Sequence, residues 1–542
     1  MTLLVIRRFA VLLSLCLLGA CRHQHPNVDA AGGAGSKPSS SASVAVAPSA
    51  SVATVATVAA SSIPIPKQRA LAPPTGTVTA AARPVLRVTP GTEGIEICKT
   101  RACDTPQKVA VGADGRVMPP SDLQRGTWFW RVAAQRGTSA GPLWSLLVRP
   151  SAGHASRVHG FDANGDGRAD LLIGAGILFG AATPAEELTP VPYAPLDVRP
   201  DAGAPPAPTS PPSVTMMPVG DVDGDGFDDA VLEGRVARGG PSGFRPETEW
   251  LACPSGKCGI AVGDVDGDGY ADLLNEGTLQ LGSPGGFREL AAPLLAGVDV
   301  VRPAGDLDGD GIADLVVLGK DKRTLSVLRG GKAGVTPGGT AVIVAPADAE
   351  VEVDIGDIDG DGIPDIVTAF SENLPGPHHT KRMTVVVRST LPGGDIAHGT
   401  ERRVTSSMNG SEEGAVSTRV QIADVDGDGF DDIVLFFADR FGGNGRMARG
   451  STAGVRLQAR PVDLRLDVDS GLTALLAVGD LNGDGRDDVL VEGRPQIGFL
   501  RTFDLHVGSK TGFAPKLFAS YNWSDGDRVA ERRLPPRTED SP

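Results

Sequence analysis

The chain has 542 residues, of which 41% are hydrophobic and 4% aromatic, and its formal net charge is −15 at pH 7. Beyond the N-terminal stretch, no apolar run is long enough to span a bilayer as a helix. The sequence also lacks the basic stripe by which proteins bind nucleic acids. We therefore expect no nucleic-acid partner and no spanning helix in the folded part.

Residues 1–20 have the features of a bacterial export signal. Arg7 and Arg8 precede a ten-residue, mostly apolar stretch, 9–18, which is too short to cross a membrane. The phrase Leu18-Gly-Ala-Cys21 resembles the lipobox of bacterial lipoproteins. That resemblance implies cleavage before Cys21 and its lipidation, with several acyl chains as the membrane anchor. Because Arg22 rather than Asp follows, it also implies an exported lipoprotein of the outer membrane or cell surface. The alternative is a secreted protein with an unmodified Cys21.

Two segments separate this signal from the main repeat region. Residues 21–83 are rich in Ala, Ser, Val, Pro and Thr, a composition that predicts a disordered tether. Residues 84–150 contain strand-like runs at 87–88, 95–98, 108–111 and 126–132, which predict a small β-sandwich module. The segment 126–145 resembles the last strands of a fibronectin type III domain, although 67 residues is short for one. We expect Trp130 and Trp144 to pack in the core or at its edge. Trp128 shares a strand face with Trp130, so one of these two should sit at the edge of the core, where it could contact a partner or the propeller.

Four cysteines beyond Cys21 form two pairs with the same spacing, Cys98 with Cys103 and Cys253 with Cys258. Local disulfides are the natural interpretation in an exported protein. A four-cysteine zinc site would require the two distant pairs to meet, and the Cys-x2-Cys spacing typical of such sites is absent.

One nine-residue motif, Asp-x-(Asp/Asn)-Gly-Asp-Gly-x-x-Asp, occurs seven times between residues 162 and 488. Oxygen-bearing side chains at positions 1, 3, 5 and 9, with a backbone carbonyl at position 7, match the six to eight oxygen ligands that Ca²⁺ prefers. Glycine at position 6 permits the positive φ of a sharp turn. Mg²⁺ fits less well because it requires near-octahedral geometry and retains water. A metal-free Asp-Gly turn is the alternative, but seven copies with the same oxygen pattern favour metal.

Each motif thus supplies five candidate ligands, and up to seven Ca²⁺ ions are expected. Numbering the loops one to seven, the candidates are Asp162, Asn164, Asp166, Arg168 and Asp170; Asp221, Asp223, Asp225, Phe227 and Asp229; Asp264, Asp266, Asp268, Tyr270 and Asp272; Asp306, Asp308, Asp310, Ile312 and Asp314; Asp357, Asp359, Asp361, Ile363 and Asp365; Asp424, Asp426, Asp428, Phe430 and Asp432; and Asp480, Asn482, Asp484, Arg486 and Asp488. The two loops that contain Asn should bind more weakly.

The spacing of the loops indicates the fold. Short apolar, β-branched runs follow them, and consecutive loops start 42 to 67 residues apart, close to what a four-stranded propeller blade needs. A second repeat, Gly-x-x-x-Gly-(Phe/Val), begins at Gly282, Gly330, Gly450 and Gly508. Together these motifs resemble the FG-GAP/VCBS repeats of integrin α-subunit propellers. The resemblance implies an all-β fold, a seven-bladed propeller over residues 155–520 preceded by the small β-sandwich, with residues 521–542 a disordered tail.

The charge distribution is consistent with metal binding. Of the 66 Asp and Glu residues, 26 stand at ligand positions, so the remainder of the chain has a surplus of 11 positive charges. The net acidity is therefore a property of the loops, and seven divalent ions would nearly cancel it.

No local motif of a known enzyme class is present. His378 and His379 stand in a Pro- and Gly-flanked loop, where a solvated pair is the simpler interpretation than a transition-metal site. The longer repeats contain the segments 189–213 and 371–414, which are either tolerated insertions or a ligand-contacting rim. We expect a non-enzymatic module for recognition, adhesion or scaffolding, with an unidentified protein or glycan ligand. The alternative is a polysaccharide-binding or polysaccharide-degrading surface protein with its site over the propeller channel.

Overall fold

The computed structural model describes residues 68–532 except 80, 136–138, 150–155, 159, 174–175, 184, 186–188, 191–215, 233, 347–348, 374–379, 410–416, 440–441, 458–461, 466–469, 496–499, 515–518 and 525–530. Within these residues the regular elements are β-strands and three short 3₁₀ helices, η1 (Glu247–Glu249), η2 (Pro254–Gly256) and η3 (Pro293–Leu295). None of the described helices has the length and apolar character needed to cross a membrane. The fold is all-β, as expected.

Residues 70–158 form two sheets. The first contains β1 (Ala70–Ala72), β3 (Leu86–Val88) and β6 (Arg116–Val117). The second has the order β5-β4-β7-β8-β2-β9, from β5 (Gln107–Ala110), β4 (Gly94–Cys98), β7 (Gly126–Val132), β8 (Trp144–Val148), β2 (Thr77–Thr79) and β9 (Ser156–Val158). We call residues 68–149 and β9 the N-terminal module; because β9 pairs with β2, the repeated sheets begin after the expected start at 155. The module starts earlier than the expected boundary at 84, because β1 and β2 pair with β3 and β8 and so belong to it.

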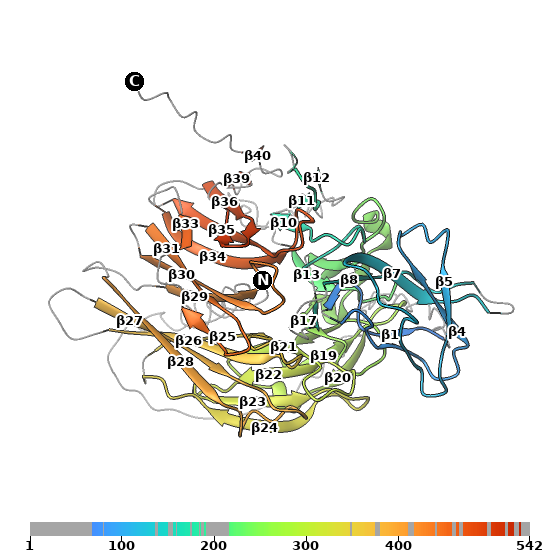
Figure 1. Cartoon of the computed structure of the whole chain (residues 1–542), viewed down its shortest axis with the longest axis horizontal. Helices are drawn as coiled ribbons and strands as arrows, with labels where there is room; N and C mark the ends of the chain where they lie inside the picture. Colours follow the sequence, from blue (N-terminus) through green and yellow to red (C-terminus); the bar gives the residue numbers. More distant parts are fainter. Residues whose placement is uncertain are drawn as a thin grey trace, which may run out of the picture. The chain divides into compact units, whose positions relative to one another are not determined.

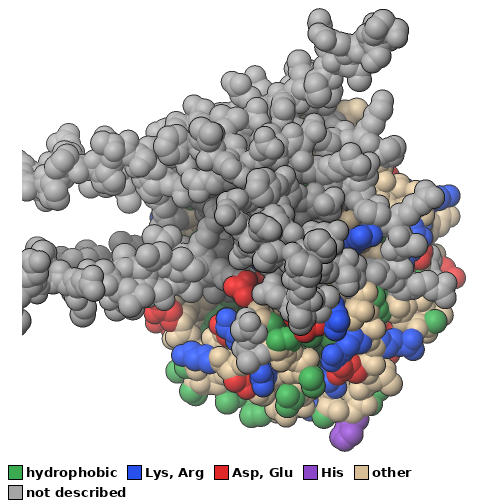
Figure 2. Space-filling model, turned by 90° about the vertical axis from the view of Figure 1, so that its left-hand side faces the viewer, with side chains coloured by type: hydrophobic (Ala, Val, Ile, Leu, Met, Phe, Trp, Pro, Cys, Tyr) green, Lys and Arg blue, Asp and Glu red, His purple; other side chains and the backbone are tan. Residues whose placement is uncertain are grey.

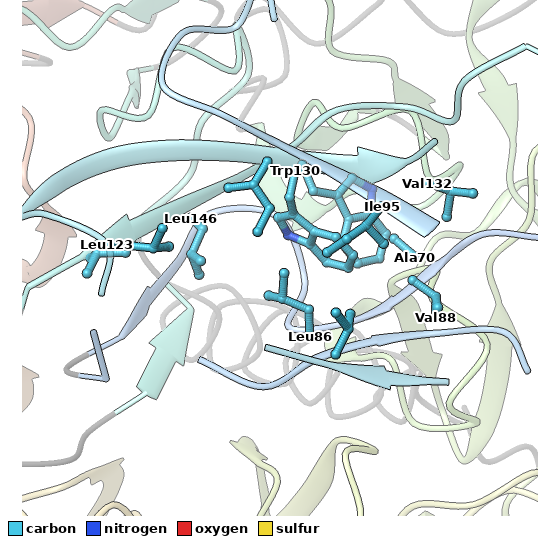
Figure 3. Packing of buried hydrophobic residues seen from close by; sticks show 12 residues of the cluster. Ala70, Leu86, Val88, Ile95, Leu123, Trp130, Val132 and Leu146 are labelled. Atoms are coloured by element: carbon cyan, nitrogen blue, oxygen red, sulfur yellow. The ribbon is translucent and has the colours of Figure 1, made fainter. Parts of the chain in front are cut away.

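The two sheets share one hydrophobic core (Figure 3). Leu86 and Val88 come from the smaller sheet, and Ile95 and Trp130 from the larger one. Trp130 is 1% exposed, and its ring meets that of Trp144 edge-on at 5.5 Å between centroids. Both tryptophans are therefore core residues, whereas Trp128 is only partly buried against the same cluster.

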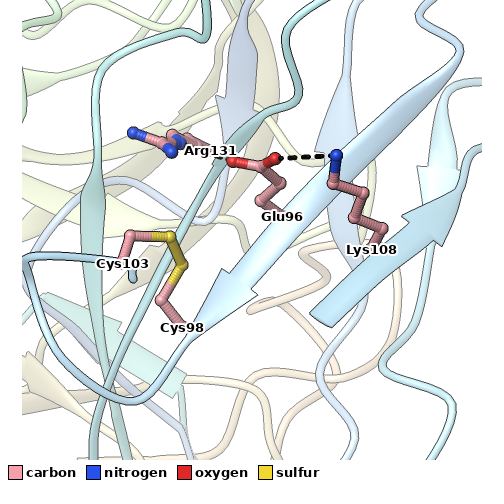
Figure 4. The surroundings of a disulfide bond; sticks show 5 residues. All are labelled: Glu96, Cys98, Cys103, Lys108 and Arg131. Atoms are coloured by element: carbon pink, nitrogen blue, oxygen red, sulfur yellow. Dashed lines mark hydrogen bonds and ion pairs between the residues drawn. A yellow bond between two sulfur atoms is a disulfide. The ribbon is translucent and has the colours of Figure 1, made fainter. Parts of the chain in front are cut away.

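Both expected cysteine pairs are joined in the structure. Cys98–Cys103 closes the turn after β4, and Cys253–Cys258 encloses η2, each with 5.1 Å between Cα atoms. Beside the first pair, Glu96 of β4 forms ion pairs with Arg131 at 2.8 Å and Lys108 at 3.6 Å (Figure 4). These contacts tie β4 to both of its neighbouring strands, β5 and β7.

The remainder of the chain repeats one antiparallel sheet (Figure 1). In the second to seventh repeats the nine-residue loop joins the first two strands of the sheet. The strands, in order, are β10 (Leu171–Ile173), β11 (Gly176–Leu178) and β12 (Thr189–Pro190); β13 (Met217–Gly220), β14 (Asp229–Leu232), β15 (Arg235–Ala237) and β16 (Leu251–Ala252); β17 (Ile260–Gly263), β18 (Asp272–Asn275), β19 (Thr278–Leu281) and β20 (Arg288–Ala291); β21 (Val300–Gly305), β22 (Asp314–Leu318), β23 (Thr324–Arg329) and β24 (Thr336–Val342); β25 (Val351–Gly356), β26 (Asp365–Asn373), β27 (Thr380–Arg388) and β28 (Glu401–Asn409); β29 (Ser417–Ala423), β30 (Asp432–Asp439), β31 (Gly442–Arg449), β32 (Arg456–Leu457) and β33 (Val462–Arg465); and β34 (Ser470–Gly479), β35 (Asp488–Pro495), β36 (Leu500–His506), β37 (Gly508–Ser509), β38 (Gly512–Phe513), β39 (Ala519–Ser524) and β40 (Glu531–Arg532).

Adjacent sheets pack face to face through apolar side chains. Strands such as Leu315–Leu318 of β22 are buried along their whole length, because both faces of the sheet meet a neighbour. Leu279 of the third sheet and Val317 of the fourth lie in one cluster. The first and last sheets also pack together, since Leu171 and Ile173 share a cluster with Leu490 and Leu505. The series of sheets therefore closes on itself.

The last sheet continues past the expected boundary at residue 520. Strand β39 pairs with β36, Tyr521 is fully buried, and β40 pairs with β39. Several other expectations lie outside the described residues: the signal at 1–20, Cys21, the tether up to residue 67, the pair His378–His379, and the chain after residue 532.

Candidate metal centres

All seven nine-residue loops share one backbone conformation. The glycines at positions 4 and 6 have positive φ in each loop, for example +74° and +87° at Gly224 and Gly226. Other residues rarely adopt this conformation, so glycine at both positions is required for so tight a turn. The sequence analysis predicted a glycine with positive φ at position 6, and the structure shows the same requirement at position 4.

The carboxylate at position 1 organises each loop. In the second loop, Oδ1 of Asp221 accepts the backbone N–H groups of Gly224 (2.7 Å) and Asp225 (3.0 Å), and Oδ2 accepts that of Gly226 (2.8 Å). The same pattern recurs at Asp306 and Asp357. These bonds turn the chain around the first carboxylate. The position-3 carboxylate converges with it in loops two to six, the position-5 carboxylate in loop two, and the position-9 carboxylate in loops three to six.

The closing aspartate at position 9 joins the loop to a later part of its sheet. Oδ2 of Asp229 accepts the N–H of Val222 at 3.0 Å, and Oδ1 accepts that of Gly239 at 2.8 Å. In the other repeats the equivalent second donors include the leading glycines of the second sequence repeat, Gly282, Gly330, Gly450 and Gly508. The leading glycine of that repeat therefore has a structural role: its backbone N–H donates to the carboxylate of the closing aspartate.

In five loops, three carboxylates converge so that one oxygen of each lies within 4.8 Å of the others. These groups are Asp221, Asp223 and Asp225; Asp264, Asp266 and Asp272; Asp306, Asp308 and Asp314; Asp357, Asp359 and Asp365; and Asp424, Asp426 and Asp432. The carboxylates of loops one and seven, although both loops are described, form no such group. These are the two loops with asparagine at position 3.

Apart from Oδ2 of Asp223, which pairs with Arg238, three oxygens in these groups are buried without a hydrogen-bond partner: Oδ1 of Asp266, Oδ1 of Asp359 and Oδ2 of Asp432. A buried carboxylate oxygen without a partner carries a desolvation cost. A cation at the centre of each group would remove that cost. Carboxylate oxygens are the hard donors that suit Ca²⁺. The residues present therefore fit this ion.

Burial and mutual repulsion change the acidity of the loop carboxyls. Burial, followed by the charge of Asp268, raises the pKa of Asp264 to about 8. Burial, followed by the charge of Asp359, raises the pKa of Asp365 to about 8. The pKa of Asp268 rises to about 7 for the same two reasons, with Asp266 as the neighbouring charge. In the absence of a cation, burial and repulsion therefore favour the protonated form of these three carboxyls, and a bound divalent cation would oppose it.

Backbone hydrogen bonds connect each loop to the previous one. The N–H at position 8 donates to the position-1 carbonyl of the preceding loop, as from Ala271 to Asp221 at 2.8 Å and from Ala313 to Asp264 at 2.9 Å. In the fifth loop Pro364 stands at position 8 and has no N–H to donate. The loops therefore form one hydrogen-bonded series, with an interruption where proline occurs.

The sequence analysis missed the aspartates at position 8. Oδ2 of Asp228, Asp431 and Asp487 accepts the N–H of the position-1 residue of the preceding loop, at 2.8 to 3.0 Å. All three are buried. The Asp-Asp pairs that end these loops were the available signal, but only the fold shows that the first Asp of each pair faces another repeat.

Arginines near the loops were also missed. Within the repeated sheets, Arg449 forms an ion pair with Asp426 at 2.6 Å and Arg288 with Asp266 at 3.5 Å. Another set comes from the N-terminal module: Arg69 toward Asp268, Arg87 to the Asp310 carbonyl, Arg101 to the carbonyls of Gly165 and Gly226, Arg125 to the Gly485 carbonyl, and Arg149 to Asp480 and Asp487. The positive surplus outside the loops was the signal for these contacts.

The module contacts loops seven, one, two, three and four, which are consecutive in the closed series. Its contacts reach the position-6 glycines: a Cβ on Gly226 would lie 2.0 Å from the Leu143 carbonyl oxygen, and one on Gly269 would lie 2.6 Å from that of Ala70. The absent side chains thus permit the close approach of the module.

Comparison with known proteins gives limited further information. Residues 306–368, from loop four to the strand after loop five, match the model of an FG-GAP-like repeat. No curated protein sequence matches the chain. Among solved structures, an exotype rhamnogalacturonan lyase, YesX, aligns over 86% of this chain and 90% of its own, at 12% identity and a TM-score of 0.22. At that TM-score the alignment carries no argument about fold or activity.

Proposed function

We propose that this protein is a calcium-dependent recognition module in which Ca²⁺ ions bind the nine-residue loops. The observation that carries the proposal is the convergence of three carboxylates in loops two to six, with partnerless buried oxygens in three of them. Ca²⁺ would supply positive charge at the centre of each loop. The residues of the chain would orient the oxygens and hold the loop closed through the position-1 hydrogen bonds.

The proposed architecture is a seven-bladed β-propeller preceded by a fibronectin type III-like sandwich. Support comes from six loops that join the first two strands of successive sheets and from the packing of the first sheet on the last. The match of residues 306–368 to an FG-GAP-like repeat agrees with this proposal. The N-terminal module, with sheets of three and six strands around one core, supports the sandwich assignment.

The calcium proposal makes a quantitative statement about stability. If each site had a Kd near 10⁻⁴ M, about 1 mM calcium would stabilise the fold by roughly 1.4 kcal/mol per occupied site. The test is thermal unfolding of the purified chain in about 2 mM calcium and in EGTA, well above and below that Kd. A rise in Tm of several degrees in calcium, with magnesium giving less, supports the proposal. Equal melting in both solutions would mean that the loops are metal-free turns.

We further propose an exported lipoprotein, anchored through Cys21, that presents the propeller to an extracellular protein or glycan ligand without catalysing a reaction. The lipobox-like phrase and the absence of local catalytic motifs in the sequence support this part of the proposal. Metabolic labelling of wild type and Cys21→Ser with a fatty-acid probe tests the anchor. Label on wild type alone is expected.

The alternative proposal, a polysaccharide site over the channel, needs uncommitted polar groups on the first strands of the sheets. Arg419 of β29 pairs with Glu352 of β25 at 3.1 Å, and Arg302 of β21 donates to the Val353 carbonyl at 2.7 Å. These residues thus link neighbouring sheets. On the described part of one face, acidic, basic and hydrophobic side chains are intermixed without a dominant patch (Figure 2). Binding to a glycan array, abolished by substitutions on these strands, would favour the alternative.

A further inference from the structure

Loop seven differs from the metal-binding pattern in its sequence. Its position 3 is Asn482 and its position 7 is Arg486, whereas loops two to six have aspartate at position 3 and an uncharged residue at position 7. The Arg486 guanidinium pairs with Asp484 at position 5, with 3.2 Å between Nη1 and Oδ2. The loop therefore loses one negative charge and gains one positive charge at the ligand positions, which makes it a poorer site for a divalent cation.

A second guanidinium, from the N-terminal module, meets the loop's organising carboxylate. Nη2 of Arg149 lies 2.9 Å from Oδ2 of Asp480, and Nη1 lies 3.4 Å from Oδ1 of Asp487. The three side chains are only 5% to 6% exposed. The backbone of Arg149 is fixed as well, because its N–H donates to the Thr79 carbonyl at 2.8 Å. This is a buried, two-pronged ion pair, of the kind that arginine makes better than lysine.

Asp480 also accepts the loop's own N–H groups from Gly483, Asp484 and Gly485. With Arg149, its carboxylate has at least four donors. In loop five, the carboxylate of Asp357 has the equivalent three backbone donors. There the carboxylates of Asp359 and Asp365 converge with that of Asp357. None of these described partners of Asp357 comes from the module. The two loops share a backbone and differ in what neutralises position 1.

We propose that loop seven binds no metal ion and is instead stabilised by Arg149. Its guanidinium neutralises the carboxylate of Asp480, as Ca²⁺ neutralises the position-1 carboxylate in loops two to six. This inference rests on the proposed calcium function for the comparison with those loops. Docking of the module then stabilises loop seven in the way that metal binding stabilises the others. Loop seven keeps its conformation, and the module its contact, when calcium is removed.

Hydrogen–deuterium exchange of the full chain tests this proposal, because the amides bonded to position 1 report on each loop separately. In EGTA, amides 360–362 of loop five should lose protection, while amides 483–485 of loop seven should keep it. Arg149→Met should lower protection of loop seven in EGTA by roughly ten- to a hundredfold, as expected for loss of a buried charged hydrogen bond. Calcium should not restore this protection, because Asn482 and Arg486 still stand at positions 3 and 7 of the loop.

Arg125→Ala is the matched control, because Arg125 also contacts loop seven but only through the exposed carbonyl of Gly485, at 3.4 Å. It should behave as wild type. Loss of loop-seven protection on chelation of wild type, or equal behaviour of Arg149→Met and Arg125→Ala, would overturn the proposal. If Arg149→Met unfolds the chain, Arg149→Lys is measured in calcium instead. Reduced protection of loop seven with unchanged protection of loop five supports the proposal. Unchanged protection of both loops overturns it. If protection of loop five is unchanged in EGTA, the proposed calcium function is wrong. The comparison of Arg149→Met with wild type in EGTA still tests whether Arg149 stabilises loop seven.

Discussion

The backbone N–H of Ala169, in the first loop, donates to the carbonyl oxygen of Asp480, in the seventh, at 3.1 Å. It is the same position-8 to position-1 bond that joins successive loops elsewhere, here made between residues more than 300 positions apart. The first and last sheets also share a hydrophobic cluster. Ring closure is therefore built from the same contact as the other junctions except the one at loop five, where Pro364 stands at position 8.

Removing a single metal ligand should remove one ion and a fixed amount of stability. We expect Asp266→Ala to lower the number of bound calcium ions by one and to lower the free energy of unfolding in about 1 mM calcium by roughly 1–2 kcal/mol. Native mass spectrometry and denaturant unfolding measure the two effects. The exposed Asp122 provides the control, since Asp122→Asn should change neither. An unchanged ion count in Asp266→Ala would contradict the assignment of loop three.

Stability should depend on pH with opposite signs in the two metal states. The pKa values of Asp264 and Asp365 are raised to about 8 by burial and neighbouring carboxylates, whereas unfolded aspartates titrate near 4. Metal-free folded protein thus binds more protons than the unfolded chain, and the stability contributed by these groups is lost as pH rises from about 4 to 8. In EGTA, Tm should fall over this range.

In calcium, protons compete with the ion for the same oxygens. Apparent calcium affinity should therefore fall as pH is lowered below about 7, the pKa to which Asp268 is raised. Calcium titrations followed by calorimetry at several pH values measure this. The same pH slope of Tm with and without calcium would show that the loop carboxyls are not the ligands.

The position-8 aspartates should contribute stability without binding metal. Asp431→Ala removes the acceptor of the Asp357 N–H, a buried bond of 2.9 Å, and should cost about 1–3 kcal/mol. The ion count should not change. Asp431→Asn retains an acceptor oxygen and should cost less. A lost ion in Asp431→Ala would place this residue among the ligands instead.

Alanine substitutions at two glycines with similar φ distinguish the cost of backbone strain from the cost of steric contact with the module. Gly226 (φ +87°) faces the Leu143 carbonyl, whereas Gly309 (φ +82°) has open space where a Cβ would be. Both alanine variants should incur the cost of positive φ, of order 1 kcal/mol or more. Gly226→Ala should cost clearly more in thermal unfolding, because the module must move away. Equal costs would show that the module does not press on loop two.

Much of the local structure could be predicted from the sequence, because its causes are local. The nine-residue spacing determines a turn with inward carboxylates, and apolar runs such as Leu315–Leu318 form strands because both of their faces are buried. Packing in the module core or at its edge was expected for Trp130 and Trp144, and both lie in the core; of Trp128 and Trp130, Trp128 is the one that is only partly buried. The boundaries were less accurate: β1 precedes the expected start of the module, and β39 continues beyond residue 520, because pairing with distant strands defines these elements.

By itself, the sequence determined the number of loops, their oxygen-rich character and the all-β class, since these follow from residue types at short spacing. Only the tertiary structure decided what surrounds each loop. Asp431 reaches the preceding loop and Arg149 reaches Asp480 across more than 300 residues of chain. Loops with nearly the same sequence thus differ in the group that neutralises their carboxylates. The charge of a buried carboxylate is balanced by the groups that the fold brings within a few ångströms. Those groups come from distant parts of the chain, so the sequence of the loop does not reveal them.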